Sequence, residues 1–245
     1  MKDGLGEMNK KAILFDLDGT LLPMNQDLFL KEYFGGLVTV LVKEGFDKDI
    51  SFNAIMKGTK AMIMNDGSKT NESSFWESFT REIRHDFSSE MDIFTRYYDG
   101  DFIKAKSLCK FNPMSRKIVD AVKDAGMRVI LATNPVCPPE ATYKRIEWAG
   151  LKVSDFELVT TYQNSSYSKP NPMYYKEILE KQSLLPEECV MVGNDTDDDL
   201  AAKKIGIDVF ILTDCLINNN NVNLSEIPSG DFSVLLEFLE KIKER

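Results

Sequence analysis

Short apolar runs alternate with helical patterns along most of the chain. The runs predict strands at residues 12–15, 128–132, 189–192 and 209–212, with a weaker fifth at 156–160. Almost every position in them is apolar, which is typical of strands buried on both faces of a parallel sheet. Helical patterns lie between and after these runs, at residues 115–124, 141–148, 173–181, 198–204 and 232–243. Strands that alternate with helices predict an α/β fold with a doubly wound, Rossmann-like parallel sheet.

The stretch from residue 24 to residue 110 has a different pattern. It contains helical patterns at residues 26–43, 51–64, 71–83 and 89–98, and it has no convincing strand. Glycines at turn positions, among them Gly45, Gly67 and Gly100, separate these helices. The sequence therefore predicts an all-helical domain at residues 24–110, inserted into a core domain made of residues 1–23 and 111–245.

Composition and charge limit the partners of the protein more than its chemistry. Of 245 residues, 43% are hydrophobic and 28% are charged, as in ordinary folded domains. The net charge of -9 argues against nucleic acid or an anionic membrane as the main partner, because both attract clustered Lys and Arg. A small anionic substrate is compatible with this charge, since a bound cation reverses the field at a single site. The pattern does not predict an oligomeric state.

The cysteines and the N-terminal residues bear on location. Four widely spaced cysteines form no CxxC pair, and with the single His85 they predict no zinc site. Such scattered cysteines are typical of free thiols in a reducing compartment. Residues 1–11 lack the apolar segment of a signal peptide, and no stretch approaches the ~18 apolar residues of a membrane span. We expect a soluble cytoplasmic protein.

Two carboxylates follow the first predicted strand. Asp16 ends the run and Asp18 comes two residues later, so alternation along extended backbone turns both side chains to one side. Gly19 then allows a tight turn. A single aspartate at a strand end is more often a turn or N-cap residue. Two of them at this spacing suit metal binding, or a nucleophile paired with an acid/base group.

Further polar groups follow the other predicted strands. Thr133 and Asn134 offer a hydroxyl, an amide and backbone N–H groups to phosphate oxygens. Lys169 supplies a compact positive charge in the loop that contains SKPNP. Residues 193–199 read GNDTDDD and place oxygen ligands of the kind Mg²⁺ prefers beside the start of a helix. The carboxyl ends of parallel strands meet at one edge of a sheet, so these groups are candidates for one site.

The motifs DLDGT, TN, SKPNP and GND with further acids, in this order, resemble those of the haloacid dehalogenase superfamily of phosphatases. The resemblance covers the whole chain. It implies a Rossmann-like core with an inserted helical cap of the C1 type, which closes over the site and selects the substrate. It also implies Mg²⁺-dependent hydrolysis of a small phosphorylated metabolite through an aspartyl-phosphate. A phosphotransferase or sugar-phosphate mutase shares these motifs, and a non-catalytic protein that binds a phosphorylated ligand is a third hypothesis.

The resemblance assigns roles to single residues. Asp16 is the nucleophile and a metal ligand, and Asp18 protonates the leaving oxygen, activates water and offers its carbonyl to the metal. Thr133, Asn134 and Lys169 bind the phosphoryl group, whose charge fixed donors and cations stabilise. Asp18 favours phosphoryl transfer over dehalogenation, because the dehalogenating branch lacks a carboxylic acid at this position.

The fourth motif departs from the commoner family pattern, since Asn194 follows the glycine where an aspartate is usual. Without a gap the functional pair is Asn194 and Asp198, whereas a shift by one residue gives Asp195 and Asp199. We favour Asp195 as the metal ligand, because a carboxylate binds Mg²⁺ better than a neutral amide does. Asp198 or Asp199 then supports Asp195 without binding the metal itself.

Residues of the helical insertion receive simpler interpretations. His85 lies in this insertion, where a surface or capping role is expected. Aromatic residues at near-helical spacing predict buried positions, and arginines of the same region are expected on solvated faces, although they are also candidates to meet an anionic substrate. These residues are Phe75, Trp76, Phe79, Tyr97 and Tyr98, and Arg81, Arg84 and Arg96.

Overall fold

Six parallel strands form the centre of the structure, a computed structural model that describes residues 10–243. Their order in the sheet is β3-β2-β1-β4-β5-β6. The strands are β1 (Ala12–Phe15), β2 (Arg128–Leu131), β3 (Leu158–Val159), β4 (Cys189–Gly193), β5 (Asp208–Leu212) and β6 (Ser229–Gly230). The five predicted strands are present, and β6 was missed because two small residues carry no apolar pattern. The predicted doubly wound α/β fold with an inserted helical cap is confirmed.

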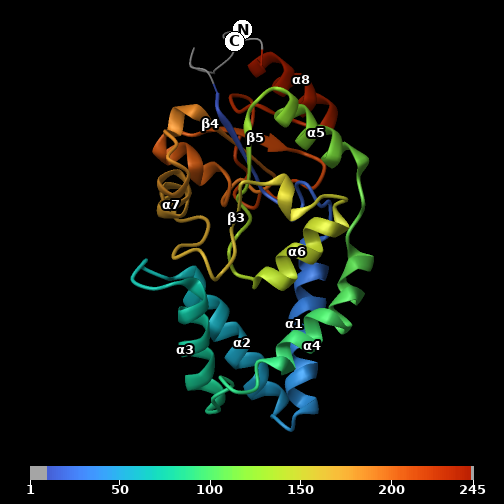
Figure 1. Cartoon of the computed structure of the whole chain (residues 1–245), viewed down its shortest axis with the longest axis vertical. Coiled ribbons are helices and arrows are strands. Elements are labelled where there is room, and N and C mark those ends of the chain that lie inside the picture. Colours follow the sequence, from blue (N-terminus) through green and yellow to red (C-terminus); the bar gives the residue numbers. More distant parts are fainter. Residues whose placement is uncertain (1–9, 244–245) are drawn as a thin grey trace.

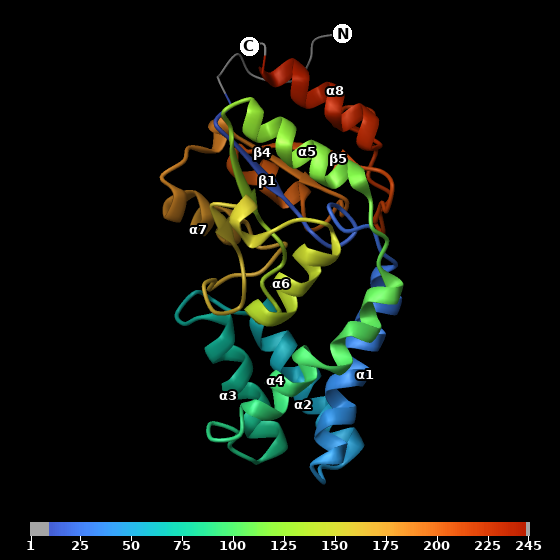
Figure 2. The same cartoon turned by 45° about the vertical axis from the view of Figure 1, so that its right-hand side comes forward.

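Helices cover both faces of the sheet (Figures 1 and 2). On one face lie α5 (Pro113–Asp124) and α8 (Phe232–Lys243), in one hydrophobic cluster with Ile13 and Phe15. On the other face lie α7 (Pro172–Gln182) and the 3₁₀ helix η4 (Leu200–Ile205), in a second cluster with Ala12 and Leu14. Alternate residues of β1 therefore enter opposite layers, which explains why this strand is apolar throughout.

One predicted α-helix is wrong in type and extent. Residues 198–204 were expected to be α-helical, but the chain forms a turn up to Asp199 and then η4. The Oδ1 atom of Asp195 accepts hydrogen bonds from the backbone N–H groups of Asp197 and Asp198, at 2.7 and 3.1 Å. This local turn holds the first residues out of a regular helix.

The insertion is helical throughout and forms the lower half of the molecule in Figure 1. Its helices are α1 (Gln26–Lys43), α2 (Lys48–Ile63), α3 (Asn71–Ile83), α4 (Asp92–Asp99) and the 3₁₀ helix η1 (Asp101–Leu108). Of the aromatic residues expected inside, Phe79, Tyr97 and Tyr98 are buried, and Phe75 and Trp76 are partly buried against them. The three arginines expected on solvated faces are exposed. His85 is half-buried and its Nε2 lies 3.2 Å from Glu90.

Hydrogen bonds join the insertion to the core at two main places, and the packing of Phe102 on Trp148 and the ion pair of Asp99 with Lys144 add further contacts. Where the chain leaves and re-enters the core, Met24 forms an antiparallel bridge with Cys109, and the backbone N–H of Lys110 donates to the carbonyl of Pro23 at 2.7 Å. These two connections lie side by side beneath the sheet. The boundaries at residues 24 and 110 stay a prediction.

The second place is the N-terminus of α3, which we call the Asn71 clasp. The buried Asn71 side chain donates through Nδ2 to the carbonyls of Pro135 and Tyr167 and to Oγ of Ser168, at 3.1, 3.2 and 3.1 Å. Its backbone N–H donates to the carbonyl of Ser165 at 2.8 Å. The cap is therefore fastened directly to the loop that precedes Lys169.

The structure bears on two features from which we expected a soluble cytoplasmic protein, the lack of a membrane span and the scattered cysteines. Among residues 10–243, no helix combines the length and apolar character needed to cross a bilayer. All four cysteines are free, with Cys137 and Cys189 buried and Cys109 and Cys215 half-buried. Residues 1–9, on which part of the interpretation of the N-terminus rests, lie outside the described residues.

Candidate active site

Asp16 lies at the carboxyl end of β1 and is 8% exposed. Its Oδ1 accepts a hydrogen bond from Nζ of Lys169 at 2.9 Å, and its Oδ2 lies 3.4 Å from the hydroxyl of Thr20. Burial raises the pKa of Asp16 to about 7, although the charge of Lys169 lowers it. The carboxylate is therefore held firmly through one oxygen and only loosely through the other.

Lys169 is buried between two carboxylates. Its Nζ donates to Oδ1 of Asp199 at 2.7 Å as well as to Asp16. Burial acts to lower the pKa of Lys169, but the charges of Asp16 and Asp199 raise it well above its ordinary value. The side chain is thus a fixed cation at the end of β1.

Asp18 forms an ion pair that the sequence did not predict. Its Oδ2 accepts a hydrogen bond from the guanidinium of Arg145, a buried residue of α6 (Pro139–Trp148). Arg145 also donates to the carbonyl of Ala141 and the hydroxyl of Thr142, at 3.1 and 3.2 Å. Burial raises the pKa of Asp18, although Arg145 and Lys169 lower it. An arginine beside Ile146, on the apolar face of a helix, was the signal that could have revealed this partner.

Thr133 and Asn134 follow β2, which pairs with β1, so they reach the same edge of the sheet. The carbonyl of Thr133 accepts hydrogen bonds from the hydroxyls of Thr160 and Tyr174, at 2.6 and 2.9 Å. Nδ2 of Asn134 donates to Oδ2 of Asp198 at 3.2 Å. Within residues 10–243, Oδ1 of Asn134 is buried without a hydrogen-bond partner. These hydrogen bonds hold the backbone of the loop after β2 in place, while Oδ1 of Asn134 is left without a partner among the described residues.

Asn194 is engaged in supporting the turn after β1. Its Oδ1 accepts a hydrogen bond from the hydroxyl of Thr20 at 2.9 Å, and its Nδ2 donates to the carbonyl of Cys215 at 2.8 Å. It fills the space beside Gly19, where any Cβ would overlap the amide, and Gly19 has a φ of +84°. Both ends of the Asn194 side chain are therefore occupied by protein groups.

Asp195 and Asp199 are linked to each other. Oδ2 of Asp199 accepts a hydrogen bond from the backbone N–H of Asp195 at 2.9 Å, while its Oδ1 binds Lys169. Burial raises the pKa of Asp195, and it raises the pKa of Asp198 to about 6. These contacts agree with the register that pairs Asp195 with Asp199, and they make Asp199 the brace of Lys169.

These residues surround one small cavity of about 30 Å³. All six predicted site residues are among those that line it. The lining comprises Asp16, Asp18, Gln26, Thr133, Asn134, Lys169, Asn194, Asp195, Asp198 and Asp199. The geometry brings the predicted residues together, while their roles stay predictions.

The donor set fits a hard divalent cation. Five carboxylates and one lysine line the cavity, so acids outnumber the cation, and burial raises the pKa of four of these acids. Oδ1 of Asp18, like that of Asn134, has no hydrogen-bond partner within the described chain. Among the described residues, no three His, Cys, Asp or Glu side chains are gathered closely enough to form a ligand cluster by themselves. Coordination by a few carboxylates, a carbonyl and water molecules is the coordination that Mg²⁺ prefers in proteins.

Comparisons with known proteins agree with this fold. The family model described as haloacid dehalogenase-like hydrolase matches residues 10–206. A phosphoglycolate phosphatase of Colwellia psychrerythraea is 28% identical over 210 residues, which cover 83% of this chain and 84% of the relative. Among solved structures, a haloacid dehalogenase-type phosphatase from Thermococcus onnurineus is similar, with a TM-score of 0.56, 20% identity and coverage of 95% and 97%.

The parallel sheet with a helical insertion after its first strand, and the acids that contact a buried lysine at the strand ends, agree with a hydrolase of this family. The chain belongs to the haloacid dehalogenase-like hydrolase family. The resemblance in the sequence is thereby confirmed.

Proposed function

We propose that the protein hydrolyses phosphomonoesters of small metabolites with Mg²⁺, through a phosphoryl group carried on Asp16. The supporting observation is the chain of contacts from Asp199 to Lys169 to Asp16, which fixes one oxygen of a buried carboxylate at the end of β1. Thr133 and Asn134 line the same cavity, where donors to phosphate oxygens are needed. A nucleophile, a fixed cation and an acid/base group in one cavity support phosphoryl transfer.

The reaction follows from the contacts of the two aspartates. Oδ2 of Asp16, which has only a long contact with Thr20, forms the bond to phosphorus while the bond to the leaving oxygen breaks. Asp18 carries a proton on Oδ1, the oxygen that Arg145 does not bind, and gives it to the leaving oxygen. Asp18 then takes a proton from a water molecule, which attacks phosphorus and releases inorganic phosphate from Asp16. Throughout, Lys169 offsets charge on Asp16 and on the transferring group.

Asp16, the carbonyl of Asp18 and Asp195 are the groups that would hold Mg²⁺. The ion supplies charge neutralisation to the phosphoryl oxygens when it is bound. Asn194 is an unsuitable ligand, because Thr20 and the carbonyl of Cys215 occupy its amide. The free cysteines support a reducing, cytoplasmic location, which we include in the proposal.

Phosphate release from a panel of phosphorylated metabolites, with and without Mg²⁺, tests this function. Because relatives are named phosphoglycolate phosphatase, 2-phosphoglycolate belongs in the panel beside sugar, amine and aryl phosphates. We expect release to require Mg²⁺ and to disappear in Asp16→Asn, while the exposed control Asp197→Asn keeps it. No release from any ester, or full activity in Asp16→Asn, would contradict the proposal.

A further inference from the structure

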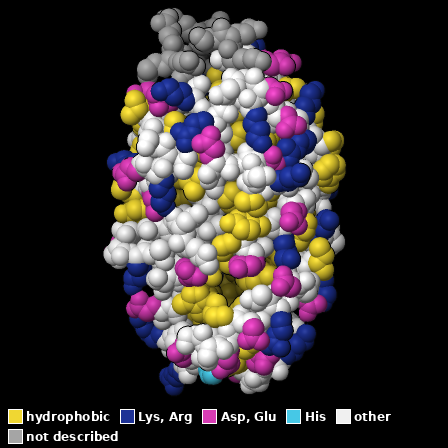
Figure 3. Space-filling model, viewed as in Figure 1, with side chains coloured by type: hydrophobic (Ala, Val, Ile, Leu, Met, Phe, Trp, Pro, Cys, Tyr) yellow, Lys and Arg dark blue, Asp and Glu magenta, His cyan; other side chains and the backbone are white. Residues whose placement is uncertain are grey.

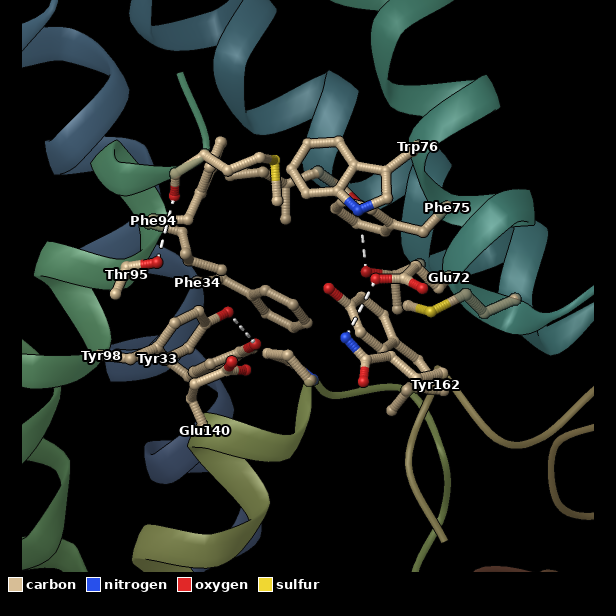
Figure 4. Close-up of a pocket in the computed structure, with 18 residues that line it drawn as sticks. Tyr33, Phe34, Glu72, Phe75, Trp76, Phe94, Thr95, Tyr98, Glu140 and Tyr162 are labelled. Atoms are coloured by element: carbon tan, nitrogen blue, oxygen red, sulfur yellow. Dashed lines mark hydrogen bonds between the residues drawn. The ribbon is translucent and has the colours of Figure 1, made fainter. Parts of the chain in front are cut away.

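A second cavity, of about 110 Å³, lies between the cap and the core (Figure 4). It is formed by helices α1 to α4 and by the core loops after β2 and β3. None of its lining residues lines the cavity at Asp16. A cavity of about 150 Å³ in another protein accommodates benzene, so this volume suits one small ring or a short alkyl group. The proposed hydrolysis does not by itself account for this space.

The cavity wall is mainly aromatic. Seven aromatic side chains line it, among them Phe34, Trp76 and Tyr162, and aliphatic side chains such as Leu37 and Ile55 complete the wall. Figure 4 shows several of these rings pointing toward a common centre. Aromatic rings present a negative face to a ligand that lies against them. The wall therefore favours an apolar body and tolerates a positive charge on it.

The charges at the cavity are of one sign. Glu72 from the first turn of α3 and Glu140 from the first turn of α6 lie on different sides of it (Figure 4). None of the described residues that line it is Lys, Arg or His. Figure 3 shows a hollow in the cap half of one face, with hydrophobic side chains inside and acidic side chains beside it.

Neither carboxylate is neutralised by a described residue of the protein. Across residues 10–243, no Lys or Arg forms an ion pair with Glu72 or Glu140. Oε1 of Glu72 accepts one hydrogen bond, from Nε2 of Gln163 at 3.2 Å. Two carboxylates and an aromatic wall attract a cation through charge and through the ring faces, and they repel an anion.

We propose that this cavity binds a small organic ammonium group with an apolar body. The charge of the ligand complements Glu72 and Glu140, and its apolar part replaces water against the aromatic wall. The same ammonium group can belong to either of two molecules. One is a free amine, and the other is a phosphorylated amine whose leaving group carries the ammonium. The second source rests on the proposed function, whereas the first does not.

The cavity is connected to the catalytic acids by contacts between side chains. Tyr33 lines the cavity, and its ring is stacked on Phe29 with 6.3 Å between centroids. The guanidinium of Arg145 lies 5.8 Å from the centroid of Phe29 and pairs with Asp18. A ligand that contacts Tyr33 is therefore linked to the ion pair of Arg145 with Asp18 through the side chains of Tyr33 and Phe29.

Calorimetry on the full chain at pH 7 tests the ligand chemistry with three probes of similar shape, benzylamine, benzyl alcohol and benzoate. We expect benzylamine to bind at least ~10-fold more tightly than benzyl alcohol, and benzoate to bind most weakly. Glu72→Gln and Glu140→Gln should each weaken benzylamine binding by about 3–10-fold and leave benzyl alcohol binding unchanged. Glu147→Gln, an exposed change on the same helix as Glu140, should have no effect.

Equal affinity for the amine and the alcohol, tighter binding of benzoate, or no binding of the amine would overturn the proposal. The probes bind without turnover, so repeating the calorimetry in Asp16→Asn keeps this result independent of hydrolysis. Circular dichroism of each variant separates lost binding from lost folding, and the exposed Glu140 offers the variant least able to disturb the fold.

Phosphate release distinguishes the two sources. Tyramine O-phosphate carries the ammonium group on its leaving group, and 4-ethylphenyl phosphate is its neutral match. If the leaving group occupies the cavity, Glu140→Gln lowers kcat/KM for the ammonium ester several-fold more than for the neutral ester. If a free amine is the ligand, both esters respond alike to Glu140→Gln while benzylamine binding still weakens.

Discussion

The guanidinium of Arg145 pairs with Oδ2 of Asp18, although 127 positions separate these residues in the sequence. Arg145 is 2% exposed, so its charge depends on this carboxylate for compensation. The pair ties α6, a helix at the border with the cap, to the turn after β1. Through it, the group proposed to move protons has a fixed position before any substrate arrives.

Breaking this buried pair from either side should destabilise the protein. Arg145→Gln and Asp18→Asn should each lower the free energy of unfolding by about 3 kcal/mol, because each leaves an uncompensated buried charge. The double variant should lose at least ~1 kcal/mol less than the sum of the single losses. Urea denaturation of the four proteins measures this coupling, and strictly additive losses would show that the pair contributes nothing.

Substitution of the two aspartates of DLDGT should impair different steps of the reaction. Asp16→Asn should form no phosphoenzyme, because the atom that bonds phosphorus loses its charge. Asp18→Asn should still form one slowly and should lower kcat about 10²–10⁴-fold, because a proton must reach the leaving oxygen. Rapid quenching with a labelled phosphomonoester separates the two steps. Small and equal effects of both changes are incompatible with these roles.

The Mg²⁺ dependence should identify the residue of the fourth motif that binds the ion. Asp195→Asn should raise the Mg²⁺ concentration for half-maximal activity at least ~10-fold. Asn194→Ser should instead lower the melting temperature and leave the Mg²⁺ dependence unchanged, because Asn194 holds Thr20 and the carbonyl of Cys215. The exposed Asp197→Asn is the control. The opposite assignment is correct if Asn194→Ser is the variant that needs more Mg²⁺.

Asp155 should make stability depend on pH. Burial acts to raise its pKa, but hydrogen bonds from Arg116, Lys123 and the backbone N–H of Lys152 lower it well below its ordinary value. A lowered pKa gives stability that is complete above the unfolded pKa of about 4 and is lost as pH falls below it. Asp155→Asn should cost about 1–2 kcal/mol at pH 7.

The gap between Asp155→Asn and the unchanged protein should close as the pH of the denaturation buffer falls from 5 toward 3. Asp124→Asn, an exposed change at the end of α5, is the matched control and should leave the curve unchanged. A gap that stays constant down to low pH would assign the stabilisation to packing and not to charge.

Local pattern predicted the elements of this fold well, because the burial of each strand on two faces leaves a signature within four or five residues. Helices α1, α3 and α8 have the predicted limits. The gathering of Asp16, Thr133 and Lys169 followed from strand ends that meet at one edge. Contacts whose partners lie far apart in sequence carry no local signature, and the pair of Arg145 with Asp18 is one of them.

The role of Asn194 also depends on residues that lie far away in the sequence. Its position invited a metal-binding role, but whether an amide is free depends on the atoms around it. The hydroxyl of Thr20 and the carbonyl of Cys215 come from other loops, and spacing within the motif contains no information about them. The cavity beneath the cap is also a property of packing, since helical spacing assigns its aromatic residues simply to an interior.

The Asn71 clasp joins the cap to the loop that carries Lys169. Packing of Phe102 on Trp148 and the ion pair of Asp99 with Lys144 also hold the cap to the core, and any separation at the N-terminus of α3 breaks the hydrogen bonds of Asn71. Ser168, one of the partners in the clasp, directly precedes Lys169, the residue that holds Asp16. The contact between the cap and the loop at Ser168 is thus one residue away from the lysine that contacts both Asp16 and Asp199.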